Sequence, residues 1–327
     1  MAKAVVCSEH GLPDKLSLVH DWEIPDLGPN DVRMEVKAAG LNFPDVLIIQ
    51  GKYQMQPQMP FVPGGESAGV VTEVGSAVTR WSVGDSVIQL GGGVGGFASE
   101  AVVNEKALLP KPNKIDFTAA AGVGMTYFTS YYALKQRGQL KAGETMLVMG
   151  AAGGVGSTAV ELGKVMGARV IAAASSDEKL ELCKQLGADE VINYSNESLK
   201  DRVKELTGGA GVDVVYDPVG GDFSEPAVRS MGWKGRYLVI GFASGPIPSI
   251  PLNLTLLKGC SIVGVFWGRF TMEETEVHLA NIDTLWQWFQ EGKIKPAITD
   301  LFPIHAYEGA YAARMERRAK GKGILTF

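Results

Sequence analysis

Apolar residues in the first 120 positions occur in short runs that alternate with turns. The runs cover residues 4–8, 16–24, 32–39, 67–74 and 86–90. Gly and Pro clusters at residues 11–13 and 26–30 separate the first three runs, and a Gly-rich hairpin is expected at residues 91–96. Short apolar runs bounded by such turns are typical of β-strands. The pattern therefore predicts a β-barrel or sandwich in this part of the chain.

The middle of the chain has a different rhythm, in which short apolar strands alternate with helices. Strands are predicted at residues 145–149, 169–174, 191–193, 212–216, 235–240 and 261–266. Helices are predicted at residues 157–166, 178–186, 199–206 and 222–231. This alternation favours a parallel sheet with right-handed crossovers. Six strands are enough for a complete doubly wound α/β domain.

The C-terminal segment returns to the pattern of the first region. Residues 298–302 and 323–327 are predicted strands on either side of a helix at residues 306–317. Thr271 and Glu274 form a capping-box pattern, which predicts that a helix begins there. We therefore expect residues 267–327 to complete the domain formed by residues 1–123, with residues 124–266 inserted as a second domain.

Composition and charge narrow the possible partners and the cellular location. The 327 residues include 31 Lys and Arg against 36 Asp and Glu, which gives a net charge of −5. An acidic chain without a basic cluster is a poor binder of nucleic acids and anionic membranes. The sequence shows neither a transmembrane run nor a signal peptide, and Cys7, Cys183 and Cys260 are too scattered for a disulfide framework. We expect a cytoplasmic protein.

A Gly-rich turn at residues 150–156 lies between a predicted strand and a predicted helix. Ala151 replaces the first Gly of the G-x-G-x-x-G fingerprint, but Gly153 still allows the backbone to approach a pyrophosphate and Gly156 still allows close packing of helix and strand. The N-terminus of the helix supplies free N–H groups for the phosphates. The turn therefore predicts dinucleotide binding, and the alternative is a tight turn with a structural role only.

The end of the second strand of this region indicates which dinucleotide is bound. An NAD site carries an acidic residue there for the ribose 2′-hydroxyl. This chain instead has Ser175 and Ser176, with Lys179 just beyond, and Asp177 is expected to serve as the N-cap of the next helix. Hydroxyl groups and an ammonium group suit a 2′-phosphate, so we predict NADP(H). The alternative is that Lys179 is an ordinary surface lysine.

Several motifs together resemble a known family. They lie at residues 39–45, 63–71, 151–156, 186–189, 191–194 and 213–217. The chain resembles the medium-chain dehydrogenase/reductase superfamily, on its zinc-independent NADPH:quinone oxidoreductase (zeta-crystallin-like) branch. The resemblance implies a GroES-like β-barrel catalytic domain and a six-stranded parallel Rossmann domain, with the active site in the cleft between them. It also implies a homodimer, often formed by pairing Rossmann edges, which would use residues 261–266.

The resemblance also bears on metal binding and on the substrate. Zinc alcohol dehydrogenases of this superfamily have Cys at the position of Asn42 and His at the position of Gly65, so we expect no metal here. Without a metal, nothing helps to deprotonate the hydroxyl of an alcohol substrate. Reduction of a quinone instead gives a phenolate-like anion, whose conjugate acid has a pKa of about 10. We predict transfer of hydride to quinones or similar α,β-unsaturated carbonyls. The alternatives are a dedicated enal, enone or enoyl-thioester reductase, and an NADPH-binding protein with a structural or regulatory role.

Site residues are carried over from the family by position. The pyrophosphate turn comprises Gly150, Ala152, Gly153, Gly154 and Val155. Asn42, Asp45 and Tyr53 would border the nicotinamide and the substrate, and Thr126 would contact the nicotinamide amide. The 2′-phosphate would be surrounded by Ser175, Lys179, Tyr194 and Arg317. The ribose and nicotinamide end would be lined by Gly241, Phe242, Phe266 and Trp267. Many relatives have a Tyr where this chain has Leu47, which leaves Tyr53 as the catalytic hydrogen-bond donor or, alternatively, as a packed wall of the site.

Overall fold

The computed structural model describes residues 1–91 and 94–327 and separates the chain into two compact units. The first unit consists of residues 1–125 and 298–327, and the second of residues 126–297. The predicted hairpin at residues 91–96 includes Gly92 and Gly93, which lie outside the described residues. Among the described residues, no helix has the length and apolar character needed to cross a lipid bilayer.

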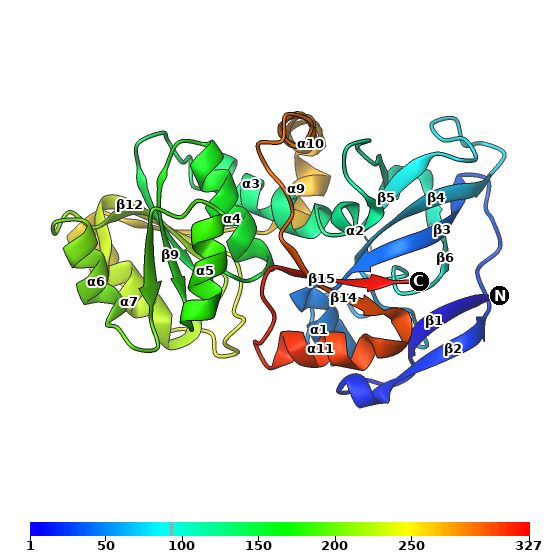
Figure 1. Ribbon diagram of the computed structural model, residues 1–327, viewed down its shortest axis with the longest axis horizontal. Coiled ribbons are helices and arrows are strands. Elements are labelled where there is room, and N and C mark those ends of the chain that lie inside the picture. Colours follow the sequence, from blue (N-terminus) through cyan, green and yellow to red (C-terminus); the bar gives the residue numbers. More distant parts are fainter. Residues whose placement is uncertain (92–93) are drawn as a thin grey trace. The chain divides into compact units, whose positions relative to one another are not determined.

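The first unit is built mainly from antiparallel strands (Figure 1). One sheet has the strand order β14-β15-β3-β4-β5-β7, with β6 also paired to β3, and a two-stranded sheet contains β1 and β2. Its strands are β1 (Ala2–Cys7), β2 (Leu16–Trp22), β3 (Asp31–Gly40), β4 (Glu66–Val74), β5 (Ser86–Leu90), β6 (Glu100–Asn104), β7 (Leu108–Pro110), β14 (Ile298–Pro303) and β15 (Lys322–Thr326). Its helices are α1 (Phe43–Ile49), α2 (Phe117–Ala120) and α11 (Tyr307–Met315).

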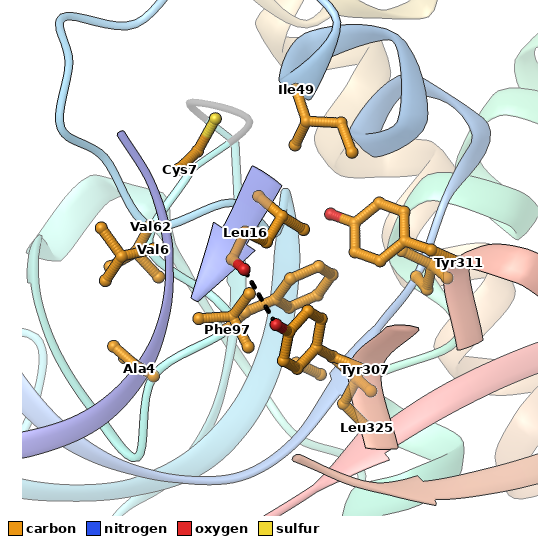
Figure 2. Close-up of a cluster of buried hydrophobic side chains, with 14 of the residues drawn as sticks. Ala4, Val6, Cys7, Leu16, Ile49, Val62, Phe97, Tyr307, Tyr311 and Leu325 are labelled. Atoms are coloured by element: carbon orange, nitrogen blue, oxygen red, sulfur yellow. Dashed lines mark hydrogen bonds between the residues drawn. The ribbon is translucent and has the colours of Figure 1, made fainter. Parts of the chain in front are cut away.

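Pairing between distant segments brings the C-terminus into this unit. Leu325 of β15 lies opposite Ala39 of β3 in an antiparallel register. The neighbouring core contains side chains from β1, β15, α1 and α11 (Figure 2). In that core the hydroxyl of Tyr307 donates a hydrogen bond of 3.0 Å to the carbonyl oxygen of Leu16. The C-terminal strand and helix are therefore integral parts of the first unit.

The second unit is a six-stranded parallel sheet with the order β10-β9-β8-β11-β12-β13. Its strands are β8 (Thr145–Met149), β9 (Arg169–Ala174), β10 (Glu190–Asn193), β11 (Val212–Asp217), β12 (Met231–Val239) and β13 (Ser261–Gly264). The longer helices between them are α4 (Gly154–Val165), α5 (Asp177–Gln185), α6 (Leu199–Leu206), α7 (Ser224–Arg229) and α8 (Asn253–Lys258). This strand order is that of a doubly wound domain, so the predicted α/β fold is confirmed.

Both ends of the second unit are helical. It begins within the π-helical turn η3 (Gly124–Phe128), which is followed by the short helix α3 (Thr129–Tyr132) and the π-helical turn η4 (Ala133–Arg137). Its last two helices are α9 (Trp267–Glu273) and α10 (Thr275–Gln290). The capping-box prediction is wrong, because Thr271 lies inside α9 and its hydroxyl donates to the carbonyl oxygen of Gly268 at 2.9 Å.

The boundary near residue 267 differs from our expectation. Residues 267–297 group with the second unit, and only residues 298–327 belong to the first. Aromatic packing accounts for the difference, because rings of α9 and α10 contact rings of the first helical segment. Tyr132 stacks on Phe270 with ring centroids 4.0 Å apart, and Tyr127 meets Phe289 edge-on at 5.0 Å. Such contacts add to the burial of apolar area, and they join segments that are far apart in sequence.

Candidate functional site

The Gly-rich turn between β8 and α4 has a backbone that other residues would distort. Gly150 adopts φ +55°, and a Cβ atom on Gly156 would lie 2.2 Å from the carbonyl oxygen of Gly150. The helix α4 begins at Gly154 after the N-cap Gly153. No side chain of the described structure caps this end, and its first turn has no acidic residue. Its N–H groups are therefore available to an anion, which fits a dinucleotide pyrophosphate.

The predicted pyrophosphate residues all lie in this turn or in the first turn of α4. They are Gly150, Ala152, Gly153, Gly154 and Val155. The structure thus brings this predicted set together at the carboxyl end of the central strand of the sheet, where doubly wound domains bind their ligands.

The end of β9 presents hydroxyl groups and a lysine. The ammonium group of Lys179 lies 3.1 Å from Oγ of Ser175, to which it donates a hydrogen bond. Ser176 is the N-cap of α5, so our expectation that Asp177 would take this role is wrong. The carboxylate of Asp177 instead accepts a hydrogen bond of 2.7 Å from the side-chain amide of Asn193. The end of β9 thus brings together a hydroxyl and an ammonium group, a combination that fits a phosphate.

Two pockets flank the loops that follow β10, β11 and β12. The larger has a volume of about 710 Å³ and is lined by Tyr194 and Phe223, whose ring centroids are 4.5 Å apart. The smaller, of about 140 Å³, is lined by Gly241 and Phe242. Ile247 lines both pockets, so these predicted cofactor residues surround neighbouring cavities of the second unit.

The remaining predicted residues of the second unit are Thr126, at its first position, and Phe266 and Trp267, at the start of α9. Thr126, in η3, is buried, and its carbonyl oxygen is 3.3 Å from the hydroxyl of Thr158. Phe266 is 56% exposed, and Trp267 is the first residue of α9.

The first unit contains a buried network of charged and polar side chains around Asn42. The side-chain amide nitrogen (Nδ2) of Asn42 donates to Oε1 of Glu66 at 2.9 Å. The ammonium group of Lys322 donates to Oδ1 of Asn42 and to the same Oε1 of Glu66. Oε2 of Glu66 accepts from the backbone N–H of Met125 at 2.8 Å. Burial lowers the pKa of Lys322, and the charge of Glu66 opposes that shift. Both polar atoms of the Asn42 side chain, Nδ2 and Oδ1, are therefore hydrogen-bonded within the first unit.

Asp45 is part of the capping box at the N-terminus of α1. Its carboxylate accepts hydrogen bonds from the backbone N–H groups of Asn42 at 2.6 Å and Gly65 at 3.2 Å. The residue is only 2% exposed, and burial raises the pKa of its carboxyl group to about 7. Asp45 thus fixes the backbone beside Asn42.

Tyr53 lies in the loop that follows α1. Its ring is half-buried against the core shown in part in Figure 2, and no described residue makes a hydrogen bond with its hydroxyl. Burial raises the pKa of Tyr53, and the negative charge of Asp45 adds to that shift. The hydroxyl is therefore protonated at neutral pH and available as a donor.

Of the residues predicted for the 2′-phosphate, Arg317 alone belongs to the first unit. It is exposed, has φ +57° and lies in the first unit, after α11, whereas Ser175, Lys179 and Tyr194 lie in the second. Sequence reasoning missed Lys322 as a partner of Asn42. A lysine in an apolar C-terminal strand was the available signal, because lysine is almost never fully buried unless it is paired.

Among the described residues, no three His, Cys, Asp or Glu side chains gather as metal ligands would. Cys7, Cys183 and Cys260 are buried free thiols. At the two family positions that differ from zinc enzymes, Asn42 is engaged by Lys322 and Glu66, and Gly65 offers only its backbone.

Comparison with known proteins places these features in a family. The model of the alcohol dehydrogenase GroES-like domain matches residues 28–113, and that of zinc-binding dehydrogenases matches residues 154–283. The chain is 40% identical over 325 residues to quinone oxidoreductase-like protein 2 homolog of Nematostella vectensis, covering 99% of this chain and 88% of that protein. It is 36% identical over 325 residues to quinone oxidoreductase of Pseudomonas aeruginosa, covering 99% of both. The crystal structure of Escherichia coli quinone oxidoreductase complexed with NADPH superposes with a TM-score of 0.92 at 29% identity over the full length of both chains.

A doubly wound sheet with a Gly-rich turn and a separate GroES-like β unit define a two-domain, dinucleotide-binding α/β protein. More narrowly, the chain belongs to the medium-chain dehydrogenase/reductase superfamily, on its quinone oxidoreductase-like branch, which confirms the resemblance noted from the sequence motifs.

Proposed function

We propose that this protein is an NADPH-dependent reductase that transfers hydride to quinones or similar conjugated carbonyls. The observation that carries the proposal is the Ser175–Lys179 pair at the end of β9. It is supported by the Gly-rich turn before α4, where no side chain of the described structure caps the N–H groups of the helix. An ammonium group and a hydroxyl suit the 2′-phosphate, which distinguishes NADPH from NADH. The NADPH complex of the related Escherichia coli enzyme supports this assignment.

When bound, NADPH supplies the hydride. The acceptor takes up this hydride and one proton, so a quinone becomes a hydroquinone. Tyr53 donates a hydrogen bond to the oxygen on which negative charge develops and passes a proton to it from solvent. Lys179 and Ser175 bind the 2′-phosphate, and the first turn of α4 binds the pyrophosphate. Thr126 contacts the nicotinamide amide.

This reaction needs no metal in our proposal. Asn42 and Gly65 provide neither a thiolate nor an imidazole, and the matched zinc-binding dehydrogenase model spans residues 154–283, which include neither position. A phenolate-like product is acidic enough, with a pKa of about 10, to form without a Lewis acid. Activity should therefore survive dialysis against a strong chelator, as checked by rate and by elemental analysis. Loss of activity that zinc alone restores would contradict this part of the proposal.

We further propose that the protein is a cytoplasmic homodimer that pairs the edge strand β13. Apolar side chains are exposed on this strand and on the helix α8 that leads into it: Ile262 of β13 is 40% exposed, and Leu256 and Leu257 of α8 are 79% and 69% exposed. An open strand edge beside apolar side chains is suited to pairing with a second copy. The free thiols of Cys7, Cys183 and Cys260 are consistent with a reducing compartment.

The proposed activity is tested by NADPH oxidation across a panel of quinones, enals, enones and enoyl thioesters. We expect the highest kcat/KM on quinones. Faster turnover of an enone or enoyl thioester would transfer the proposal to reduction of the carbon–carbon double bond. Binding of NADPH without turnover of any acceptor would instead favour a structural or regulatory role.

A further inference from the structure

One face of α4 is bonded to the segment that carries Thr126. Residues 155, 158 and 161 are three apart, so they follow one another along a single face of the helix. The carbonyl oxygen of Val155 accepts from the hydroxyl of Ser130 at 3.1 Å, and the hydroxyl of Thr158 lies 3.3 Å from the carbonyl oxygen of Thr126. The helix that begins at the dinucleotide turn is thus connected to the residues around Thr126 over two of its turns.

Glu161 makes the third of these connections. Its Oε2 accepts a hydrogen bond of 2.5 Å from the hydroxyl of Tyr127, and its Oε1 accepts one of 2.7 Å from the backbone N–H of Lys295. Tyr127 is the second residue of the second unit, and Lys295 is two residues from its end at Ala297. One carboxyl group therefore holds both ends of the unit against α4.

No cation of the described structure pairs with Glu161, whose hydrogen-bond partners are a phenol and a peptide group. Tyr127 is itself buried, and its ring contacts Phe289. The carboxyl group of Glu161 is partly buried, so it loses part of its hydration, and neutral partners replace that hydration only in part. A function in holding geometry accounts for this arrangement better than a contribution to stability.

We infer that Glu161, acting through Tyr127, is a positioning residue that fixes Thr126 relative to the dinucleotide turn and so sets the orientation of the nicotinamide. The inference rests on the proposed function for the assignment of Thr126 to the nicotinamide amide. Glu161 is not among the residues proposed to bind the phosphates, which are Lys179 and the dinucleotide turn. Removal of its carboxylate should therefore affect the nicotinamide end of the cofactor and not the phosphate end. Misplacement of a reacting group by about 1 Å can cost about 10²-fold in rate.

The test compares three variants with the wild-type protein. Tyr127→Phe removes only the hydroxyl and keeps the ring packing, and Glu161→Leu removes both acceptors. Tyr131→Phe is the matched control, since it loses a hydroxyl in the same helical segment while its ring packs on Trp288. The first readout is the fluorescence lifetime and emission of bound NADPH, which report on immobilisation of the nicotinamide. The second is kcat on the best acceptor.

We expect both Tyr127→Phe and Glu161→Leu to bind NADPH with a Kd within about twofold of wild type, since the phosphate contacts are untouched. The emission of the bound nicotinamide should shift toward that of the free cofactor, and kcat should fall about tenfold. Tyr131→Phe should match the wild-type protein in all three measurements.

The inference is overturned if Tyr127→Phe and Glu161→Leu leave both emission and kcat unchanged, or if Kd rises in step with the loss of rate. If the wild-type protein binds NADPH but turns over no acceptor, the proposed function fails while the emission comparison still tests the inference. If Glu161→Leu does not fold, Tyr127→Phe decides alone.

Discussion

Each unit contains a glutamate with internal hydrogen-bond partners, Glu66 fully buried and Glu161 partly buried, and the two carboxyl groups are neutralised in different ways. Glu66 in the first unit faces the ammonium group of Lys322, and both side chains are almost inaccessible to solvent. Glu161 in the second unit has only neutral donors, and burial raises the pKa of its carboxyl group to about 7. A buried charge needs either an opposite charge or a proton. The first unit uses an opposite charge, whereas the second uses a proton over part of the neutral range.

This difference matches what each unit contributes to the proposed reaction. The first unit provides Tyr53, an uncharged donor beside a network whose charges are balanced internally. The second unit must receive the phosphates of a dinucleotide, and its predicted contacts are N–H groups, hydroxyl groups and Lys179. A fixed negative charge near those phosphates would oppose binding. The predictions below separate these two roles.

The largest effect is expected from breaking the ion pair of the first unit. Lys322→Met leaves Glu66 buried without its counter-charge, which typically costs about 3–5 kcal/mol. We expect a loss of this size in the free energy of unfolding, measured with urea. The double variant Lys322→Met/Glu66→Gln should recover part of the loss. As a control, Lys15→Met, whose pair with Glu9 is exposed, should lower the free energy of unfolding far less than Lys322→Met does. Equal losses in Lys322→Met and Lys15→Met would show that Glu66 does not depend on Lys322 for its neutralisation.

Tyr53→Phe tests the contribution of the first unit to the reaction. Loss of an essential oxyanion donor costs about 10²–10³ in rate. An enolate is a stronger base than a hydroquinone anion, so enone reduction should slow by more than about tenfold and quinone reduction by less. The Kd of NADPH should not change, because Tyr53 is not a predicted phosphate contact. Small and equal effects on both acceptors would make Tyr53 a packing residue.

Lys179→Ala tests the contribution of the second unit. A charge-assisted contact to a phosphate contributes about 1.5–3 kcal/mol, which corresponds to about a ten- to hundredfold change in the preference for NADPH over NADH. The change should lie in the NADPH constants, and the acceptor KM should stay constant. Lys184→Ala is the control, since this exposed lysine lies on the same helix and pairs with Glu181. Equal weakening of both cofactors would contradict the assignment to the 2′-phosphate.

The smallest effect is expected at Glu161, whose hydrogen-bond partners in the described structure are uncharged. The pKa of Glu161 is about 7 in the folded protein and about 4.5 in the unfolded chain. As pH rises through this range the unfolded chain loses the proton first, so the free energy of unfolding of the protein falls. Glu161→Gln removes this loss. Relative to wild type, the variant should gain about 1–3 kcal/mol in the free energy of unfolding between pH 5 and pH 8, and most of the gain should come below about pH 7. A difference that is constant with pH would show that Glu161 is not protonated in the folded protein near neutrality.

Local sequence signals predicted most of the fold. The strands β8 and β9 and the helix α6 have their predicted bounds, because runs with a clear period and clear ends leave little choice. The Ser175–Lys179 pair also follows from sequence, since residues four apart meet on a helix or at its start. The helix α1 was not predicted. It begins inside the motif at residues 39–45, and its start has local signals: the carboxylate of Asp45 accepts from the backbone N–H of Asn42, and Pro44 lies in the first turn.

Three other missed features depend on contacts between distant segments. The boundary near residue 267 is determined by rings such as Tyr132 and Phe270, and Lys322 meets Glu66 across 256 residues. Glu161 resembles any polar residue of an amphipathic helix until Tyr127 and Lys295 are placed against it. Periodicity identifies which face of a helix is buried but not which chain ends it contacts.

The central claim is hydride transfer from NADPH to a quinone, and its most direct test is a single-turnover measurement without oxygen. The enzyme, loaded with NADPH or with NADPH deuterated at C4 on either face, is mixed with a quinone. We predict that one hydroquinone forms for each NADPH oxidised and that deuterium on one face alone slows the step. Oxidation of NADPH without stoichiometric hydroquinone, or no oxidation of the bound cofactor by any quinone, would contradict the claim.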